Sequence, residues 1–174
     1  MSVRICSGLY KSRRIACPED IRPTSDRVKE ALFSALLVDF RDIDVLDVFA
    51  GSGSLGIEAL SRGAKTATFV DSSALSINHI RKNASLLGIE NKCVIIRSDV
   101  MAYIRKCRHS FDLVFMDPPY NKGLASQLAP ELYFLIKPGG TMVVEHSPRE
   151  ALNMNTYKQK QYGDTMLTFI RREP

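Results

Sequence analysis

Short apolar runs and amphipathic stretches alternate through the middle of the chain. Each apolar run has the pattern of a buried strand, and the stretches between them repeat apolar residues with helical spacing. The expected strands are residues 44–49, 66–70, 93–96, 111–116 and 141–145. The expected helices are residues 55–62, 73–87, 100–107 and 122–136, the last interrupted or restarted near Pro130. Strands that alternate with helices predict an α/β fold, with a parallel sheet and helices on both of its faces.

The two ends of the chain follow other patterns. Residues 3–5 and 13–15 predict two short strands around a turn at Gly8, which would form a small basic hairpin. Residues 155–162 and 164–172 predict two strands joined directly at Gly163, an antiparallel hairpin that would close one edge of the sheet. A length of 174 residues suits one domain. We therefore expect a single domain over residues 1–174, with an N-terminal extension over 1–40 and a core over 41–174.

Composition excludes several classes of protein. Hydrophobic residues make up 45% of the chain, which argues against disorder, and no apolar stretch approaches the ~18 residues of a membrane span. The four cysteines form no C-x-x-C pair and have no histidine at ligand spacing, which argues against a zinc site, and we expect no metal. Scattered thiols without a signal peptide are typical of a reducing cytosol, so we expect a cytoplasmic protein.

Positive charge is concentrated in two parts of the chain. The formal net charge is +5, and residues 1–14 hold Arg4, Lys11, Arg13 and Arg14 without any acid. Residues 81–108 hold seven basic residues and two acids. Charge alone leaves two interpretations open, a solvated basic surface and a surface that binds nucleic acid.

A glycine-rich loop predicts a cofactor site. Gly51, Gly53 and Gly56 form a G-x-G-x-x-G motif between an expected strand and an expected helix. The glycines let the backbone approach a ligand, and the helix N-terminus offers N–H groups to an anion. Asp71 ends the next expected strand, where a carboxylate usually grips ribose hydroxyls.

Two further carboxylates help to identify that cofactor. Asp47 lies four residues before Gly51, at the end of the first expected strand of the core. A carboxylate there would repel a pyrophosphate and attract the ammonium and sulfonium groups of S-adenosyl-L-methionine. The loop N–H groups could then hold the carboxylate of that ligand. Asp99 ends the third strand, where it could accept a hydrogen bond from the adenine amino group or cap the following helix.

The sharpest motif is Asp117, Pro118, Pro119 and Tyr120, which follows an apolar strand at its carboxyl end. Two prolines remove two N–H donors, so the Pro118 carbonyl can act as an acceptor beside the Asp117 carboxylate. Together they suit the two N–H bonds of one base amino group, and they would free its lone pair for in-line attack on a methyl group. Asp117 would also stabilise the positive charge that develops on nitrogen, and Tyr120 could stack on a splayed-out base.

These residues together resemble the bacterial 16S rRNA guanine-N2 methyltransferases of the small ribosomal subunit. The similar segments are residues 4–5 with Gly8, 22–33, 45–53, 56–64, 69–71 and 117–120. The glycine loop and the Asp-Pro-Pro-Tyr motif identify only the superfamily, whereas residues 22–33 indicate this family. The resemblance implies a Rossmann-like class I methyltransferase fold with a seven-stranded sheet. It implies S-adenosyl-L-methionine as cofactor, catalysis at Asp117, and a guanine N2 in small-subunit rRNA as target.

Residues 22–33 predict a helix that begins near Thr24 or Ser25, either of which can cap it. Its apolar stripe indicates packing on the core. Thr24 and Arg27 lie on its first turns and could close over the active site. Packing on the core and closure over the site both stay open as roles of this helix. Ser12 departs from the family, which often has glycine there, so the resemblance does not extend to the turn of the N-terminal segment.

Four other functions compete with this interpretation. A DNA or RNA adenine-N6 methyltransferase uses the same Asp-Pro-Pro-Tyr motif, but DNA enzymes usually carry a further recognition domain. A non-catalytic RNA-binding protein of the same fold would not need Asp47, Asp71 and Asp117. A nicotinamide dehydrogenase leaves Asp117–Tyr120 unexplained, and a protein-glutamine methyltransferase would more typically have Asn at position 117.

Overall fold

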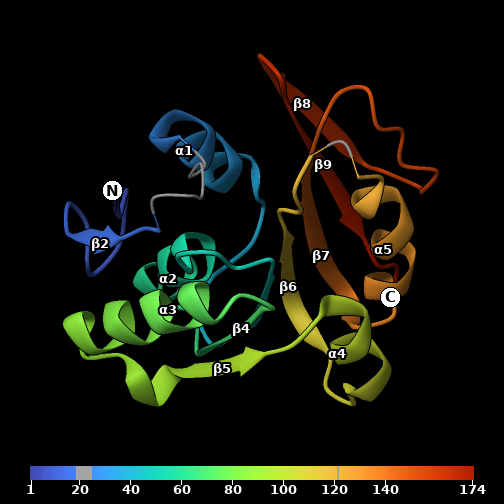
Figure 1. Ribbon diagram of the computed structural model, residues 1–174. Helices are drawn as coiled ribbons and strands as arrows, with labels where there is room; N and C mark the ends of the chain where they lie inside the picture. The colour runs from blue at the N-terminus through green and yellow to red at the C-terminus, as the bar shows by residue number, and fades with distance from the viewer. Residues whose placement is uncertain (19–24, 121) are drawn as a thin grey trace.

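A seven-stranded sheet forms the centre of the computed structural model, which describes residues 1–18, 25–120 and 122–174 (Figure 1). From one edge to the other the strands are β5 (Cys93–Arg97), β4 (Thr66–Asp71), β3 (Asp44–Val48), β6 (Phe111–Met116), β7 (Ile136–His146), β9 (Thr165–Arg171) and β8 (Lys158–Tyr162). The first five are parallel, and β9 is antiparallel to both β7 and β8. The expected Rossmann-like sheet with its C-terminal hairpin is therefore confirmed.

Helices cover both faces of this sheet, as expected (Figure 1). On one face α1 (Asp26–Ala35), α2 (Ser54–Ser61) and α3 (Ala74–Leu87) share an apolar cluster with Val45, Phe69, Phe115 and Val143. On the other face α4 (Val100–Lys106) and α5 (Leu124–Tyr133) pack on Leu46, Val70, Val114 and Met142. A 3₁₀ turn, η1 (Glu90–Lys92), leads into β5. Neighbouring residues of each strand thus face opposite layers.

The N-terminal extension is a two-stranded antiparallel hairpin, β1 (Ser2–Arg4) and β2 (Arg14–Ala16), as the sequence predicts. Its turn lies against the end of α2, where the Leu9 N–H donates to the Ser61 carbonyl at 2.7 Å. Gly8 makes this approach possible, because a Cβ there would lie only 1.9 Å from the Ser61 oxygen. Asn83 of α3 exchanges two hydrogen bonds of 2.9 Å with the Ala16 backbone. The hairpin is therefore fastened to the core rather than free in solvent.

A buried ion pair connects the extension, α1 and α2. The Lys29 ammonium lies 3.8 Å from a carboxylate oxygen of Glu58, and the two side chains are 1% and 0% exposed. Glu58 also accepts hydrogen bonds from the N–H groups of Cys6 at 2.8 Å and Ser7 at 3.0 Å. Lys29 donates in addition to the Arg4 carbonyl. Buried charges are tolerated only with such partners.

Helix α1 begins where the sequence predicts. The Ser25 hydroxyl caps it by accepting a hydrogen bond from the Val28 N–H at 3.3 Å. Thr24, the alternative cap and a candidate substrate contact, lies outside the described residues.

Two expectations about the C-terminal half are wrong. Helix α5 runs through Pro130 without interruption. The proline removes the hydrogen bond to the Ser126 carbonyl, but both residues are exposed, so water can satisfy that oxygen. Strand β7 begins at Ile136, five residues earlier than expected, because Ile136 pairs with Phe111 before the register shifts and Thr141 pairs with Leu113.

Within residues 1–18, 25–120 and 122–174, no helix combines the length and apolar character needed to cross a membrane. The same residues contain no cluster of acidic, histidine and cysteine side chains that could hold a metal ion, and the four cysteines are free thiols.

The backbone conformation of Ser12 explains why the similar family often has glycine at this position. Ser12 adopts a φ of 70°, a left-handed backbone conformation that glycine adopts without steric cost. The Ser12→Gly variant should therefore be more stable, by about 1 kcal/mol in the free energy of unfolding. The measurement is the midpoint of urea denaturation. Ser12→Ala is the matched control and should show no gain, because alanine has the same Cβ clash. Equal midpoints for wild type and Ser12→Gly would contradict the prediction.

Candidate active site

Four carboxylates lie at the carboxyl ends of neighbouring parallel strands. Asp71 ends β4, Asp47 lies in β3, Asp117 directly follows β6, and Glu145 lies near the end of β7. Strand register places Phe69 beside Asp47 and Met116 beside Val144. Because side chains alternate across a strand, all four acids lie on the sheet face that also carries α1, α2 and α3. The structure thus gathers at one edge Asp47, Asp71 and Asp117, which the sequence placed at separate strand ends, and adds Glu145 to them.

Asp47 is a buried carboxyl group below the glycine loop. It is 2% exposed, and its Oδ2 accepts the Gly56 N–H at 2.9 Å. Burial raises its pKa to about 8, and the nearby Asp71 contributes to the rise against the opposing Gly56 hydrogen bond. A group with this pKa holds a proton at neutral pH and would release it to a cationic partner. Sequence reasoning predicted the position of Asp47 but not its protonation.

The glycine loop leads directly into α2, as predicted. Gly53 caps that helix with a φ of +77° and contributes no side-chain hydrogen bond. At Gly56 an added Cβ would lie 2.4 Å from the Phe69 ring, so this glycine lets α2 pack closely on β4. The N-terminus of α2 therefore lies at the sheet edge, where its first N–H groups, apart from that of Gly56, which binds Asp47, can receive an anion.

Asp71 supports the loop from the next strand. Its Oδ2 accepts the Gly51 N–H at 2.9 Å, and its Oδ1 accepts the Ser73 N–H at 2.8 Å. These bonds fix the carboxylate beside the loop and leave it further lone pairs for a ligand. Asp99, the other candidate cofactor residue, caps α4, because its Oδ1 accepts the Ala102 N–H at 3.1 Å. The structure therefore shows the capping role of Asp99, and its contact with an adenine stays a prediction.

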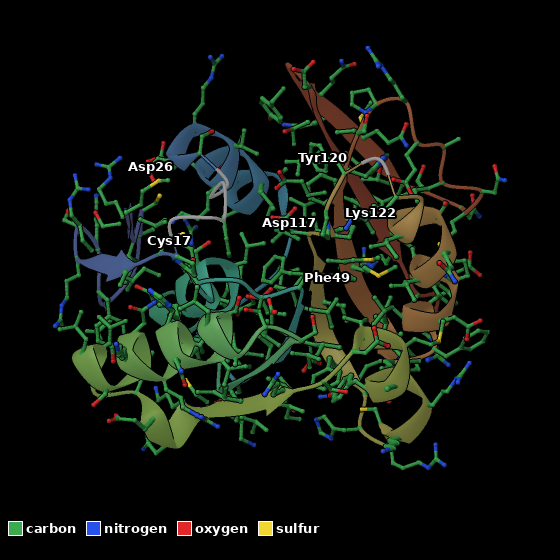
Figure 2. The ribbon with its side chains drawn as sticks, viewed as in Figure 1. Cys17, Asp26, Phe49, Asp117, Tyr120 and Lys122 are labelled. Atoms are coloured by element: carbon green, nitrogen blue, oxygen red, sulfur yellow. The ribbon has the colours of Figure 1, made fainter. Side chains whose placement is uncertain are left out.

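Phe49 is a residue that sequence reasoning missed. It connects β3 to the glycine loop with a φ of 58°, a conformation that is strained for a bulky side chain. Val48, the last residue of β3, is paired with Val70 of β4 and Met116 of β6. The next position on each strand therefore places Phe49 between Asp71 and Asp117. Figure 2 shows Phe49, Asp117 and Tyr120 at the same end of the sheet, between α1 and the C-terminal strands. Nothing in the local sequence signals a left-handed backbone at a phenylalanine.

The Asp-Pro-Pro-Tyr motif is tied to the C-terminal strands through Tyr120. Its hydroxyl donates to Glu145 Oε1 at 2.9 Å and lies 3.0 Å from Thr165 Oγ1. Burial and the Glu145 carboxylate raise the pKa of Tyr120, so the hydroxyl stays protonated and donates. Asp117 is half-buried and Pro118 is buried. Glu145 and Thr165 were not predicted, although an acid at the end of an apolar strand is a signal that could have indicated Glu145.

The candidate RNA-binding residues divide into two groups. Three have partners within the protein: Arg4 pairs with Asp26 at 3.2 Å and Glu30 at 3.7 Å, Arg13 donates to the Leu86 carbonyl at 2.8 Å, and Arg14 donates to Ser2 Oγ at 3.1 Å. Lys11 and Arg27 are exposed, as are these three arginines. The hairpin and α1 lie together on one side of the molecule (Figure 1), so these residues share one region of the surface.

Comparisons with known proteins agree with this geometry. The family model described as Conserved hypothetical protein 95 matches residues 3–171. The chain belongs to this family. A relative, Ribosomal RNA small subunit methyltransferase D of Haemophilus influenzae, is 36% identical over 172 residues, which cover 92% of this chain and 89% of the relative.

Solved structures show the same fold. The Escherichia coli protein yhhF has a TM-score of 0.89 and 30% identity, with 99% of each chain covered. An RNA methyltransferase from Salinibacter ruber, solved with S-adenosyl-L-homocysteine, has a TM-score of 0.70 and 17% identity over 87% of this chain and 94% of that one. The fold is thus that of the class I methyltransferases, which confirms the fold class implied by the sequence.

Proposed function

We propose that this protein transfers a methyl group from S-adenosyl-L-methionine to the exocyclic N2 of a guanine in the 16S rRNA of the small ribosomal subunit. The observation that carries the proposal is the position of Asp117–Tyr120 at the end of β6, beside the strand that holds Asp47 and the glycine loop. The kinship with a small-subunit rRNA methyltransferase supports RNA as the substrate. Such a substrate also favours a cytoplasmic site of action.

The residues of the glycine loop fit S-adenosyl-L-methionine. The methyl donor has a carboxylate, which suits the α2 N-terminus that Gly53 leaves without a side-chain cap. It also has two cationic groups, which suit the buried Asp47. We assign Gly51, Gly53 and Gly56 to the methionine part, Asp71 to the ribose hydroxyls and Asp99 to the adenine amino group.

Asp117, Pro118 and Tyr120 supply the chemistry on the substrate side. The Asp117 carboxylate and the Pro118 carbonyl accept the two N–H bonds of the amino group, which turns its lone pair toward the methyl carbon. As the nitrogen–carbon bond forms, the carbon–sulfur bond breaks and its electron pair stays on sulfur. Asp117 stabilises the positive charge that appears on nitrogen before the extra proton leaves. The donor supplies an activated methyl group, so neither a metal nor a protein nucleophile is required.

RNA contacts come from the side of the molecule that carries the hairpin and α1. We assign Lys11, Arg14 and Arg27 to phosphates, together with Arg4, Arg13 and Thr24. Arg4 also connects the extension to α1, and Arg13 connects it to α3. Loss of these arginines would therefore affect folding as well as binding.

The raised pKa of Asp47 predicts that cofactor binding releases a proton. Below pH 8 the carboxyl is protonated in the free protein, and binding of a cation favours the ionised form. Affinity should therefore rise with pH between about 6 and 7.5, by up to roughly tenfold per unit, before the ligand's own ammonium begins to lose its proton. Isothermal titration calorimetry in buffers of different ionisation enthalpy measures the released proton directly.

Asp47→Asn is the matched control for this experiment. It keeps the shape and removes both the charge and the titration, so the pH dependence should disappear. Affinity at pH 7.5 should fall by about tenfold or more, since a charge-assisted contact is lost. Affinity that stays independent of pH in the wild type would remove Asp47 from the cofactor site.

Methyl transfer itself should depend on Asp117. In single-turnover reactions with undermethylated small subunits, Asp117→Asn should lower the rate by about a hundredfold to a thousandfold. The asparagine would present a donor to the N–H bonds of the amine and would lack the charge that stabilises the transition state. Cofactor affinity, measured in parallel, should change little. A near-normal rate for this variant would defeat the proposed mechanism.

The product of the same reaction tests the substrate. Nucleosides from the methylated 16S rRNA should contain N2-methylguanosine at a single position when analysed by mass spectrometry. N6-methyladenosine would identify an adenine methyltransferase instead, and no transfer with intact cofactor and RNA binding would indicate a non-catalytic RNA-binding protein.

The basic hairpin should contribute RNA affinity through phosphate contacts. The double variant Lys11→Ala and Arg14→Ala should bind small-subunit RNA more weakly and reduce the slope of log affinity against log salt by about 0.7–0.9 per lost contact. A suitable control is Arg105→Ala with Lys106→Ala, since both residues are exposed on α4, which packs on the opposite face of the sheet from the hairpin and α1. If both variants bind RNA with the wild-type salt slope, the hairpin is only a solvated surface.

A further inference from the structure

Glu145 is a buried carboxylate that the transfer reaction described above does not use. It is 7% exposed, and its neighbours on the same sheet face are Val143 and Leu167. Placing a carboxylate among apolar side chains costs free energy, and such groups are common at functional sites. Its position beside the Asp-Pro-Pro-Tyr motif therefore suggests a role there.

Register brings Glu145 next to Asp117. Met116 of β6 is paired with Val144 of β7, so the following residues, Asp117 and Glu145, occupy neighbouring positions on adjacent strands. Neighbouring strands are about 4.8 Å apart, and both side chains lie on the face that carries α1. Two carboxylates are thus presented side by side at the place where the base amino group is expected.

Tyr120 links Glu145 to the substrate side of this pair. The Tyr120 hydroxyl donates to Glu145 Oε1 at 2.9 Å and lies 3.0 Å from Thr165 Oγ1. These contacts fix the carboxylate at the edge of the ring on which the base would stack. A carboxylate has about four lone-pair directions, so the bond from Tyr120 takes up only part of the acceptor capacity of Glu145.

We propose that Glu145 reads the identity of the base, by accepting the N1–H of a guanine whose N2 amino group is held by Asp117. This inference rests on the proposed function. Guanine carries N1–H and the N2 amino group side by side on one edge, so it offers adjacent donors to adjacent carboxylates. Adenine carries an unprotonated N1 beside its amino group, and Glu145 would face that lone pair with another acceptor. The pair of acids thus selects guanine, because a mismatched base would set the lone pair of its N1 against a buried carboxylate.

The test compares guanosine with 2-aminopurine at the target position. 2-Aminopurine keeps the amino group but has an unprotonated N1, so it isolates the contact assigned to Glu145. Small subunits reconstituted with either base serve as substrates in single-turnover methyl transfer. Wild type should methylate guanosine at least about tenfold to a hundredfold faster, the range expected for one charge-assisted hydrogen bond.

Glu145→Gln should change this preference. The glutamine amide can donate to an unprotonated N1, so the variant should lose rate with guanosine and gain rate with 2-aminopurine. The ratio of the two rates should fall by about a hundredfold or more, since each substrate contributes a factor of this kind. Unchanged cofactor affinity shows that the variant is folded.

Thr165→Val provides the matched control. It removes the second contact of the Tyr120 hydroxyl but leaves Glu145 in place, so any loss of rate should be equal for both bases. Glu145 would be only a positioning residue for Tyr120, and the proposal overturned, if Glu145→Gln slows both substrates equally. The proposal is likewise overturned if wild type methylates both bases at the same rate. Failure of wild type to methylate guanosine at all would instead overturn the proposed function.

Discussion

The buried pair of Lys29 and Glu58 is the interaction that joins the separate parts of this protein. Glu58 belongs to α2, the helix that begins at the glycine loop, and it also receives the Arg62 guanidinium at 3.0 Å. Lys29 belongs to α1, and the backbone of the extension binds both charges. Removal of either partner would leave an uncompensated buried charge, which typically costs about 3–5 kcal/mol. The extension, α1 and the cofactor helix therefore fold as one unit, and the candidate RNA-binding surface is held at a fixed distance from the sheet edge.

The distribution of charge separates two tasks that would otherwise conflict. The chain carries a net charge of +5, yet the carboxyl edge of its parallel strands is lined by Asp47, Asp71, Asp117 and Glu145. In the proposed function, basic side chains on the hairpin and α1 would attract phosphates, whereas acids at the sheet edge would favour a cationic methyl donor and a nitrogen that becomes positive. A polyanion would be repelled from that edge unless it were anchored elsewhere. The basic surface would thus anchor the RNA of the proposed reaction while one of its bases enters the acidic site.

Local patterns in the sequence were enough to predict most of the fold and part of the site. The glycine loop, Asp47, Asp71 and Asp117 were predictable because each depends on a short motif at a strand end. Glu145 was not, because its place beside Asp117 depends on the register between β6 and β7, which are separated by a helix. The left-handed Phe49 and the bond from Arg13 to the Leu86 carbonyl likewise depend on tertiary packing. Pro130 was misinterpreted because the solvent exposure of the Ser126 carbonyl is not visible in the sequence.

The C-terminal hairpin contributes one side of the candidate active site. A proline pair stiffens residues 118–119, but it also removes the N–H groups with which this loop could bind the rest of the protein. Tyr120 compensates, since its hydroxyl reaches Glu145 of β7 and Thr165 of β9, both far away in the sequence. Strand β9 is antiparallel to β7, and this pairing places Thr165, its first residue, at the carboxyl edge of the parallel strands. A parallel strand in the same position would present its last residue there. The reversal of direction at this edge of the sheet is therefore what brings β9 into contact with the Asp-Pro-Pro-Tyr loop.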